Sequence, residues 1–193
     1  TFRKVIKNSL EFTNDREAIL TLGMMPTRPE AGYGYIKRLQ DCETTSQQAS
    51  LQCKDVTTEA SNIHKVEAFK EKPNLETAKS YLNEGGYFWN AGIFIWNAKM
   101  VVNTISNLVP DLASVFDKIE PYFYTEQEQE IVNQYFPTCP NISIDYAVME
   151  KSDEVFVYPA NFGWSDLGTW GSLYTHLDQD ENRNATVGQN INL

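Results

Sequence analysis

The sequence predicts an α/β protein with a mixed, mostly parallel sheet and flanking helices. Short apolar runs bounded by glycine and proline alternate along the chain with segments whose apolar residues recur at helical spacing. The 193 residues are 41% hydrophobic and 22% charged, which is ordinary globular composition and enough for one substantial core. We therefore expect one domain, or a large part of one, over residues 1–178, followed by a polar, Asn-rich segment at 179–193.

The first half of the chain predicts two helices and three strands. The first helix is indicated by an apolar stripe, Phe2, Val5, Ile6 and Leu10. Strands are expected at 18–24, 34–39 and 66–69. After Pro73, Asn74 can cap a helix that carries Leu75, Ala78, Tyr81 and Leu82 on one side. The polar stretch 40–62 indicates an exposed hairpin extension or a mobile loop.

The second half begins with a strand at 87–96, followed by helices at 100–108, 112–119 and 126–135, the first two separated by Pro110. Ser143 can cap a short helix in which Asp145 and Glu150 face different sides. A strand at 155–158 comes next. The last helix is predicted from helical spacing of Leu167, Trp170, Leu173, Tyr174 and Leu177.

Composition excludes several partners. With 16 basic and 26 acidic residues the formal charge is −10, which argues against a nucleic-acid or anionic membrane surface. No run of 18 apolar residues appears, and the first residues lack the apolar core of a signal peptide. The chain is therefore expected to be soluble and cytoplasmic.

The cysteines and histidines carry no recognisable site. Cys42, Cys53 and Cys139 are an odd number without metal-ligand spacing, so free thiols are expected, with a disulfide between Cys42 and Cys53 as the alternative. His64 and His176 stand alone and are interpreted as structural or surface residues.

Asn90 is the one polar side chain in the apolar run 87–96. A buried amide without partners costs about 1–3 kcal/mol, so its hydrogen bonds must go to something specific. Gly92 allows another backbone or a ligand to approach the strand closely. Together they indicate a floor for a polar, ring-sized ligand; the alternative is an amide that satisfies a neighbouring loop.

Four segments carry a family resemblance: residues 27–36, 69–73, 87–96 and 164–170, which read TRPEAGYGYI, FKEKP, YFWNAGIFIW and WSDLGTW. In this order and spacing they closely resemble the sugar-nucleotide pyrophosphorylases, in particular the mannose-1-phosphate guanylyltransferase branch. The resemblance implies a Rossmann-like nucleotide-diphospho-sugar transferase fold. It also implies a reaction in which GTP and mannose 1-phosphate give GDP-mannose and pyrophosphate.

The same resemblance assigns a sugar-phosphate site. Lys72 is the expected catalytic cation against the sugar phosphate, and Glu71 the acceptor of two sugar hydroxyls. Gly32 and Tyr33 belong to the stretch expected over the sugar, where glycine also permits a positive φ at Gly32 and Gly34. For Glu71 the alternative is a solvated strand-end carboxylate; for the glycines it is a plain turn. Arg28 is a further candidate for phosphate.

Three more residues complete the expected site. Asn90 and Asp145 are assigned to substrate, although helix capping explains much of the segment around Asp145. Asp166 resembles the Mg²⁺ ligand of the family, and Mg²⁺ prefers one or two carboxylates plus substrate phosphates. The alternative for Asp166 is a cap on free backbone amides.

The family's glycine-rich nucleotide loop and first metal-binding Asp do not occur in this sequence and are expected to precede Thr1. We therefore expect an internal fragment, residues 1–178 being the sugar-phosphate half of the catalytic domain, with negligible nucleotidyl transfer alone. The absent strands are expected to leave an exposed sheet edge and so to favour a homo-oligomer. Two alternative functions remain: a pyrophosphorylase for another hexose 1-phosphate or base, and a non-catalytic sugar-phosphate-binding or regulatory module.

Overall fold

The computed structural model describes residues 2–40, 62–168 and 170–188. The chain divides into two compact units, Thr1–Asn161 and Phe162–Leu193, each described here by itself. The domain end expected near residue 178 falls inside the second unit. Cys42, Cys53 and nearly all of the polar stretch 40–62 lie outside the described residues, and Cys139 is a free thiol.

Five strands of the first unit close into a ring in the order β1, β4, β2, β3, β5. Their bounds are β1 Ile19–Met24, β2 Tyr35–Arg38, β3 His64–Lys70, β4 Tyr87–Ile95 and β5 Val155–Ala160. The helices are α1 Phe2–Asn14, α2 Leu75–Glu84, α3 Ala98–Leu108, α4 Pro110–Ile119 and α5 Glu128–Tyr135, with short turns η1 Glu120–Tyr122, η2 Phe136–Thr138 and η3 Asp145–Met149. The mixed α/β class with flanking helices is confirmed.

The expectation of a mostly parallel sheet is wrong. Among the described strands only β1 and β5 pair in parallel, whereas β4 is antiparallel to β1 and β2, and β3 is antiparallel to β2 and β5. Helix α2 does connect two strands of the same direction, β3 and β4, as a crossover should, but antiparallel β2 lies between them. Side-chain alternation is the same in either direction, so the sequence pattern found the strands without their orientation.

The ring covers only part of the exposed edge that was expected, because β3 and β5 pair over a short stretch. Its closing contact is short, since β3 meets β5 only at His64 with Val157 and at Lys65 with Phe156. Beyond Lys65 the outer side of β3 has no ladder to β5. The expectation of a homo-oligomer stays a prediction.

Helix boundaries follow the predicted signals. The Asn74 side chain accepts a hydrogen bond from the Thr77 amide at 2.8 Å, and Pro110 stands at the first position of α4. Helix α1 forms as predicted but buries Ser9, Phe12 and Thr13 rather than its whole apolar stripe. Two members of that stripe, Phe2 and Leu10, are exposed.

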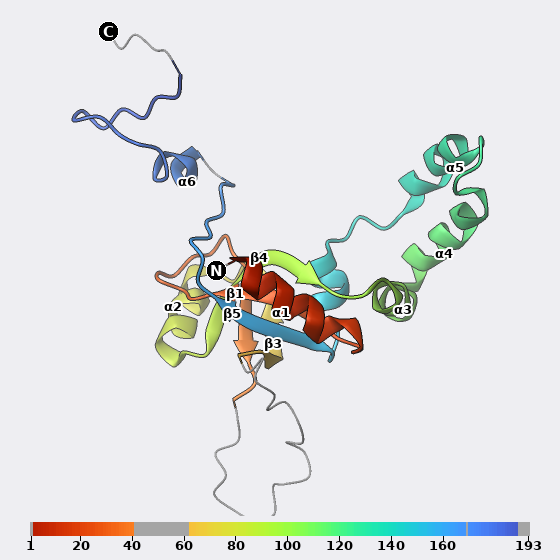
Figure 1. Ribbon diagram of the computed structural model, residues 1–193, viewed down its shortest axis with the longest axis horizontal. Helices are drawn as coiled ribbons and strands as arrows, with labels where there is room; N and C mark the ends of the chain where they lie inside the picture. The colour runs from red at the N-terminus through yellow and green to blue at the C-terminus, as the bar shows by residue number, and fades with distance from the viewer. Residues whose placement is uncertain (1, 41–61, 169, 189–193) are drawn as a thin grey trace, which may run out of the picture. The chain divides into compact units, whose positions relative to one another are not determined.

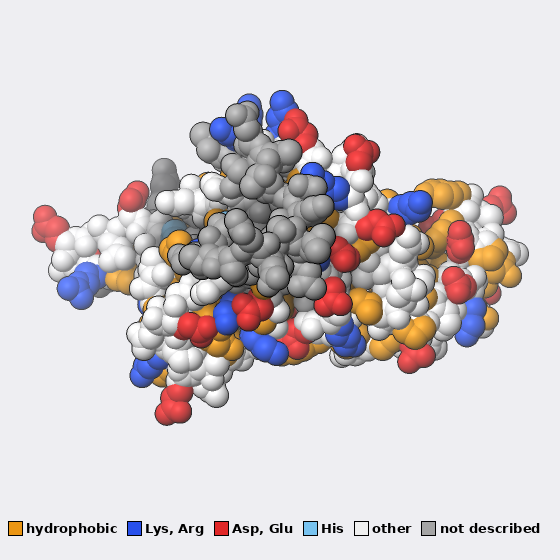
Figure 2. Space-filling view, turned by 90° about the horizontal axis from the view of Figure 1, so that it is seen from below, with side chains coloured by type: hydrophobic (Ala, Val, Ile, Leu, Met, Phe, Trp, Pro, Cys, Tyr) orange, Lys and Arg blue, Asp and Glu red, His pale blue; other side chains and the backbone are white. Residues whose placement is uncertain are grey.

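The core of the first unit lies between the sheet and the segment α3–η3. Its buried members are Ile19, Ile36, Phe69, Phe88, Met100, Val109, Ala147, Val148, Met149, Val155 and Val157. Helices α4 and α5 lead away from the sheet (Figure 1). Figure 2 shows hydrophobic side chains interspersed with acidic ones at that end, and the exposed apolar residues there include Phe116, Phe123, Tyr124 and Phe136.

The described residues of the second unit form one short helix, α6 Trp170–Tyr174, and a bridge between Gln179 and Ala185. The helix predicted from Leu167 to Leu177 is thus longer than the one observed. Trp170 is 87% exposed and Leu167 54%, so the apolar stripe buries too little surface to extend the helix in either direction. Within the described residues of both units, no helix is long and apolar enough to cross a membrane.

Candidate functional site

Asn90 lies at the centre of a polar network on β4. Its Oδ1 accepts from Thr21 Oγ1 and from the Gly92 amide, both at 3.1 Å, and its Nδ2 donates to Asp145 Oδ1 at 3.3 Å. The orientation of the amide is determined by these partners, because a backbone N–H can only donate and a carboxylate can only accept. The alternative of an amide that satisfies its neighbours is therefore largely realised, and one N–H of Nδ2 remains for a ligand.

A bulge in β4 orients the backbone beside the Asn90 side chain. In the antiparallel ladder between β1 and β4, Thr21 pairs with Phe94 and Gly23 pairs with Asn90. Between these two pairs β4 has more residues than β1, which is a β-bulge in β4. Gly92 lies in this interval with φ +69°, a left-handed conformation that favours glycine. The bulge turns the Gly92 amide back onto the Asn90 side chain. The strand is accordingly well buried over Tyr87–Trp89 and more open beyond.

Glu71 and Lys72 follow the end of β3. Their side chains form an ion pair of 3.1 Å between Glu71 Oε1 and Lys72 Nζ, with the glutamate side chain 10% exposed and the lysine side chain 62% exposed. The hydrogen bond that the Lys72 ammonium donates to Glu71 is the largest cause that raises the pKa of Lys72, and the charges of Tyr146 and Asp145 add to it. The ammonium therefore stays charged at neutral pH and is accessible to an anion.

The backbone of Lys72 is strained. Its φ is +46°, in the left-handed region that a residue with a side chain adopts only when its surroundings impose it. The next residue is Pro73, which further restricts the residue before it. Such outliers cluster at functional sites, so the conformation is an independent pointer to the Glu71–Lys72 turn.

Gly34 brings the strands together at this place. Its carbonyl accepts from the Asn90 amide at 2.8 Å, and a Cβ placed on Gly34 would lie 2.5 Å from Glu71 Oε2 and 3.3 Å from Asn90 Cβ. Neither Gly32 nor Gly34 uses the positive φ that glycine permits. The reason for glycine at position 34 is the close approach of the Glu71 carboxylate.

The segment η3 is a π-helix, and it corrects the predicted placement of two acids. In an α-helix, positions 145 and 150 would lie about 140° apart around the axis. Here the Glu150 amide donates to the Asp145 carbonyl at 2.9 Å, the i to i+5 bond of a π-helix, so the two residues lie one turn apart on the same side. The predicted Ser143 cap is also absent, since this helix start has no side-chain cap.

Both acids reach the same cluster. Asp145 contacts the Asn90 amide, and Glu150 Oε1 accepts from the Glu71 backbone amide at 3.2 Å. The structure thus brings together Asn90, Asp145, Glu71 and Lys72 of the predicted set. It adds two residues that the sequence pattern did not indicate, Thr21 and Glu150, because neither the predicted strand nor the predicted helix gave a signal of these contacts.

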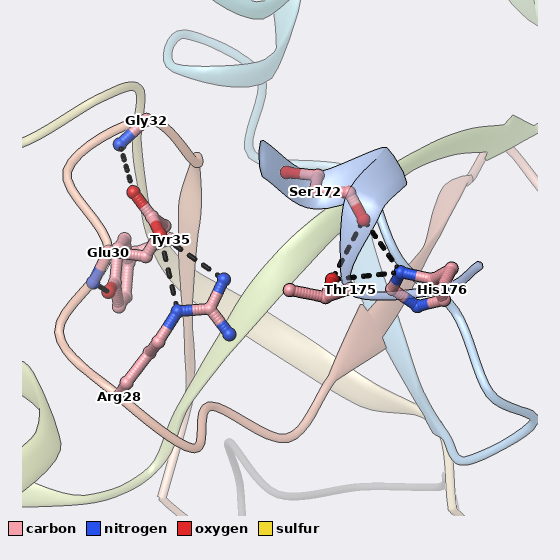
Figure 3. A network of polar contacts seen from close by, with 7 residues as sticks. All are labelled: Arg28, Glu30, Gly32, Tyr35, Ser172, Thr175 and His176. Carbon is pink, nitrogen blue, oxygen red and sulfur yellow. Dashed lines mark hydrogen bonds and ion pairs between the residues drawn. The ribbon is translucent and has the colours of Figure 1, made fainter. Parts of the chain in front are cut away.

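A second group surrounds Trp89 beside the loop 27–34. The Arg28 guanidinium pairs with Glu30 Oε2 at 3.3 Å, and Glu30 Oε1 accepts from the Gly32 amide at 3.2 Å (Figure 3). Arg28 also lies 5.3 Å from the centre of the Trp89 ring, and Tyr33 packs edge-on against it at 5.2 Å. The loop is therefore held by the contacts of Arg28 and Gly32 with Glu30 and by the packing of Arg28 and Tyr33 on Trp89.

Tyr33 and the neighbouring Tyr35 have different roles. Tyr35 is fully buried and its hydroxyl accepts from the Glu30 amide at 2.9 Å, whereas Tyr33 is half-buried. Tyr35 is thus the core residue of the pair, and the role of Tyr33 at the sugar stays a prediction. Gly32 is exposed, and its amide is engaged by Glu30.

Asp166 belongs to the second unit, between β5 and α6. Its Oδ1 accepts from the Gly168 amide at 3.0 Å, a local turn contact that lies before the first residue of α6. In the same unit His176 Nδ1 lies 2.8 Å from the Ser172 carbonyl and 3.2 Å from Thr175 Oγ1, a local contact that agrees with a structural histidine (Figure 3).

The described residues offer a partial fit for Mg²⁺. They contain no group of three or more His, Cys, Asp or Glu side chains that could hold a metal. A single carboxylate such as Asp166 nevertheless suits an ion that takes one or two carboxylates and completes its shell with phosphates and water. Asp166 fits as one ligand and not as a whole site.

The comparisons with known proteins agree with one another. A family model described as Nucleotidyl transferase matches residues 1–183. A mannose-1-phosphate guanylyltransferase of Salmonella montevideo is 38% identical over 189 residues, which are 97% of this chain and 37% of that protein. One from Escherichia coli strain K12 is 32% identical over 195 residues, 99% of this chain and 37% of that protein. The chain therefore spans about a third of the length of these relatives.

Solved structures show the same fold. The mannose-1-phosphate geranyltransferase of Thermus thermophilus matches with a TM-score of 0.70 and 28% identity, over 93% of this chain and 45% of that one. The mannose-6-phosphate isomerase of Helicobacter pylori matches with a TM-score of 0.62 over 86% of this chain and 57% of that one. At 19% identity this second likeness concerns the fold alone.

Proposed function

This chain belongs to the nucleotidyl transferase family, and we propose that it forms the sugar-phosphate-binding part of a mannose-1-phosphate guanylyltransferase. The complete enzyme would make GDP-mannose and pyrophosphate from GTP and mannose 1-phosphate. Two of the relatives that support this assignment carry that enzyme name and align with nearly the whole chain.

The observation that carries the proposal is the turn at Glu71 and Lys72. A carboxylate that is 10% exposed stands beside an exposed ammonium, and Gly34 leaves room for that carboxylate at the sheet. A carboxylate with two oxygens can accept hydrogen bonds from vicinal hydroxyls of a pyranose, and an ammonium pairs with a phosphate. Asn90, held by Thr21, Gly92 and Asp145, presents its remaining N–H to the same ligand.

In this reaction a phosphate oxygen of mannose 1-phosphate attacks the α-phosphorus of GTP. The bond from that phosphorus to the oxygen bridging to the β-phosphate breaks, and pyrophosphate leaves with the electron pair. No side-chain nucleophile is required, because alignment and neutralisation of the converging negative charges dominate catalysis. The role of Lys72 is to hold and partly neutralise the attacking phosphate, while Glu71 and Asn90 orient the sugar.

Mg²⁺ would neutralise the triphosphate and polarise the α-phosphoryl group. Asp166 is the residue of this chain that would provide one carboxylate to it. The Asp166 Oδ1 atom accepts from the Gly168 amide, so a local turn holds this carboxylate.

Calorimetric titration of mannose 1-phosphate into the chain, with and without Mg²⁺, tests the proposal. Binding is expected in the wild type and lost in Lys72→Ala and Glu71→Ala. Lys65→Ala is the matched control, since Lys65 lies on β3 and also pairs with a carboxylate, Glu154, at 3.4 Å. Equal affinity in wild type and Lys72→Ala would contradict the proposal.

Further measurements distinguish the two alternative functions, a pyrophosphorylase for another hexose 1-phosphate and a non-catalytic binding module. Tighter binding of glucose 1-phosphate than of mannose 1-phosphate would indicate a pyrophosphorylase for another hexose. A longer chain that contains this sequence, binds the sugar phosphate and makes no GDP-mannose from GTP would indicate a non-catalytic binding module.

A further inference from the structure

We propose that Glu150 is a positioning residue that holds the Glu71–Lys72 turn in its binding conformation. The inference rests on the proposed function, because it deepens the account of the same site. Glu150 acts on the backbone of the turn: its Oε1 accepts from the Glu71 backbone amide at 3.2 Å.

The need for such a partner follows from the sheet. Strand β3 pairs with β5 only at His64 and Lys65, so the outer edge of the strand beyond Lys65 has no ladder to β5. The Glu71 amide stands at the end of this edge, directly before the strained Lys72. A backbone N–H without a partner there would allow the turn to relax, since a left-handed residue persists only where neighbouring contacts impose it.

The π-helix explains why Glu150 can reach this amide. Its last three residues are in the core, Ala147 at 4%, Val148 at 0% and Met149 at 2% exposure. The i to i+5 bond between Glu150 and Asp145 places the two acids on one side at the rim. One holds the side chain of Asn90 and the other the backbone of Glu71, so a single turn anchors the site to both β4 and β3.

The required property of Glu150 is an acceptor oxygen at the right reach, and not its charge. Glu150→Gln retains that oxygen, whereas Glu150→Ala removes it. This difference separates a positioning role from direct contact with ligand, because a charge that contacted the ligand would be lost in both variants.

Two measurements test the inference: amide hydrogen exchange at Glu71 in the ligand-free chain, and calorimetric affinity for mannose 1-phosphate. Glu150→Ala is expected to accelerate exchange at Glu71 and to weaken binding about threefold to tenfold. Glu150→Gln should remain within about twofold of wild type in both. Glu154→Ala, in the neighbouring carboxylate that pairs with Lys65, is the matched control and should change neither.

The outcomes are distinguishable from failure of the proposed function. If the wild type binds and Glu150→Ala binds equally well, the inference is overturned while the function stands. Equal losses in the Ala and Gln variants also overturn it, because charge and not the acceptor would then matter. If the wild type does not bind, the proposed function fails, and exchange at Glu71 decides the positioning role: unchanged exchange in Glu150→Ala rejects it.

Discussion

The Glu71 carboxylate occupies the space in which a side chain at Gly34 would stand. A Cβ there would lie 2.5 Å from Glu71 Oε2 and 3.5 Å from the ring tip of Phe69. The carboxylate is the movable end of a side chain, whereas the strands on either side are fixed by their ladders. The absence of a side chain at Gly34, just before β2, therefore determines where the Glu71 carboxylate, in the turn after β3, can lie.

The substitution Gly34→Ala is expected to displace the Glu71 carboxylate with little effect on stability. Affinity for mannose 1-phosphate should fall about tenfold, since one charge-assisted contact of about 1.4 kcal/mol corresponds to that factor. The melting temperature should stay close to that of the wild type. Calorimetry and thermal denaturation on the same preparation check both.

Gly23→Ala is the contrasting variant for this prediction. A Cβ at Gly23 would meet Val157 Cγ2 at 2.6 Å and Phe88 Cβ at 2.8 Å, both in the packed core. Overpacking of this kind typically destabilises by about 1–3 kcal/mol. If Gly34→Ala instead melts as low as Gly23→Ala, the Glu71 carboxylate is not free to move aside.

Replacing Lys72 by glycine or by alanine separates backbone strain from charge. Both variants lose the ammonium and should lose binding. Lys72→Gly should unfold with a free energy about 1 kcal/mol higher than Lys72→Ala, because only glycine adopts φ +46° without a steric cost. Urea denaturation of the two variants measures this difference. A more stable alanine variant would show that the left-handed turn is not kept in solution.

Lys37 joins α2 to the sheet through two carboxylates, Glu84 at 2.9 Å and Glu67 at 3.3 Å. The hydrogen bond from Lys37 holds the pKa of Glu84 below its ordinary value of 4.5, and the same contact raises the pKa of Lys37 above 10.5. A lowered carboxylate pKa contributes stability above 4.5 that is lost as the pH falls through the lowered value. A raised lysine pKa contributes stability below 10.5 that is lost as the pH rises through the raised value.

The variant Lys37→Met should therefore be less stable than the wild type by a constant amount between about pH 5 and pH 10. The difference should shrink below pH 4.5, where Glu84 becomes protonated in the unfolded and then in the folded chain. Chemical denaturation at several pH values gives the two curves. Lys79→Met is the control, because Lys79 lies on α2, the helix that carries Glu84. A stability difference between Lys37→Met and the wild type that does not change with pH would reject the assignment of the ion pair.

Arg183 offers a test within the second unit. Its φ is +64°, and the turn is held by Asp180, whose Oδ1 accepts from the amides of Asn182 and Asn184 at 2.9 and 2.8 Å. Arg183→Gly should slow amide exchange in this turn relative to Arg183→Ala, by a factor that corresponds to about 1 kcal/mol. Equal exchange in the two variants would mean that the turn does not require the left-handed conformation.

Much of the secondary structure was predictable because its signals are local. Asn74 caps α2 and Pro110 begins α4, since a cap depends on residues within one turn of it. Strand β4 was predictable from its apolar run, and Tyr87–Trp89 are buried as expected. The ladder that reverses β2 between β3 and β4 was not, because strand direction leaves no mark on the pattern of side chains.

The candidate site shows the same division. Lys72, Glu71 and Asn90 were predicted from motifs, but those motifs did not show that the Asn90 amide is largely satisfied by Thr21, Gly92 and Asp145. Glu150 was missed because an α-helix was assumed where the chain forms a π-helix. Whether Asp166 is a metal ligand stays a prediction.

The sequence by itself determined most of the helices and strands, the Asn74 cap and the motifs that led to the family. Only the tertiary structure decided that five strands close into a ring, that Glu71 lies against Gly34, and that Asp145 and Glu150 hold β4 and β3 from one turn. The physical reason is range: propensities and caps act within a few residues, whereas these contacts join positions 55 and 79 residues apart and form only when the core has closed.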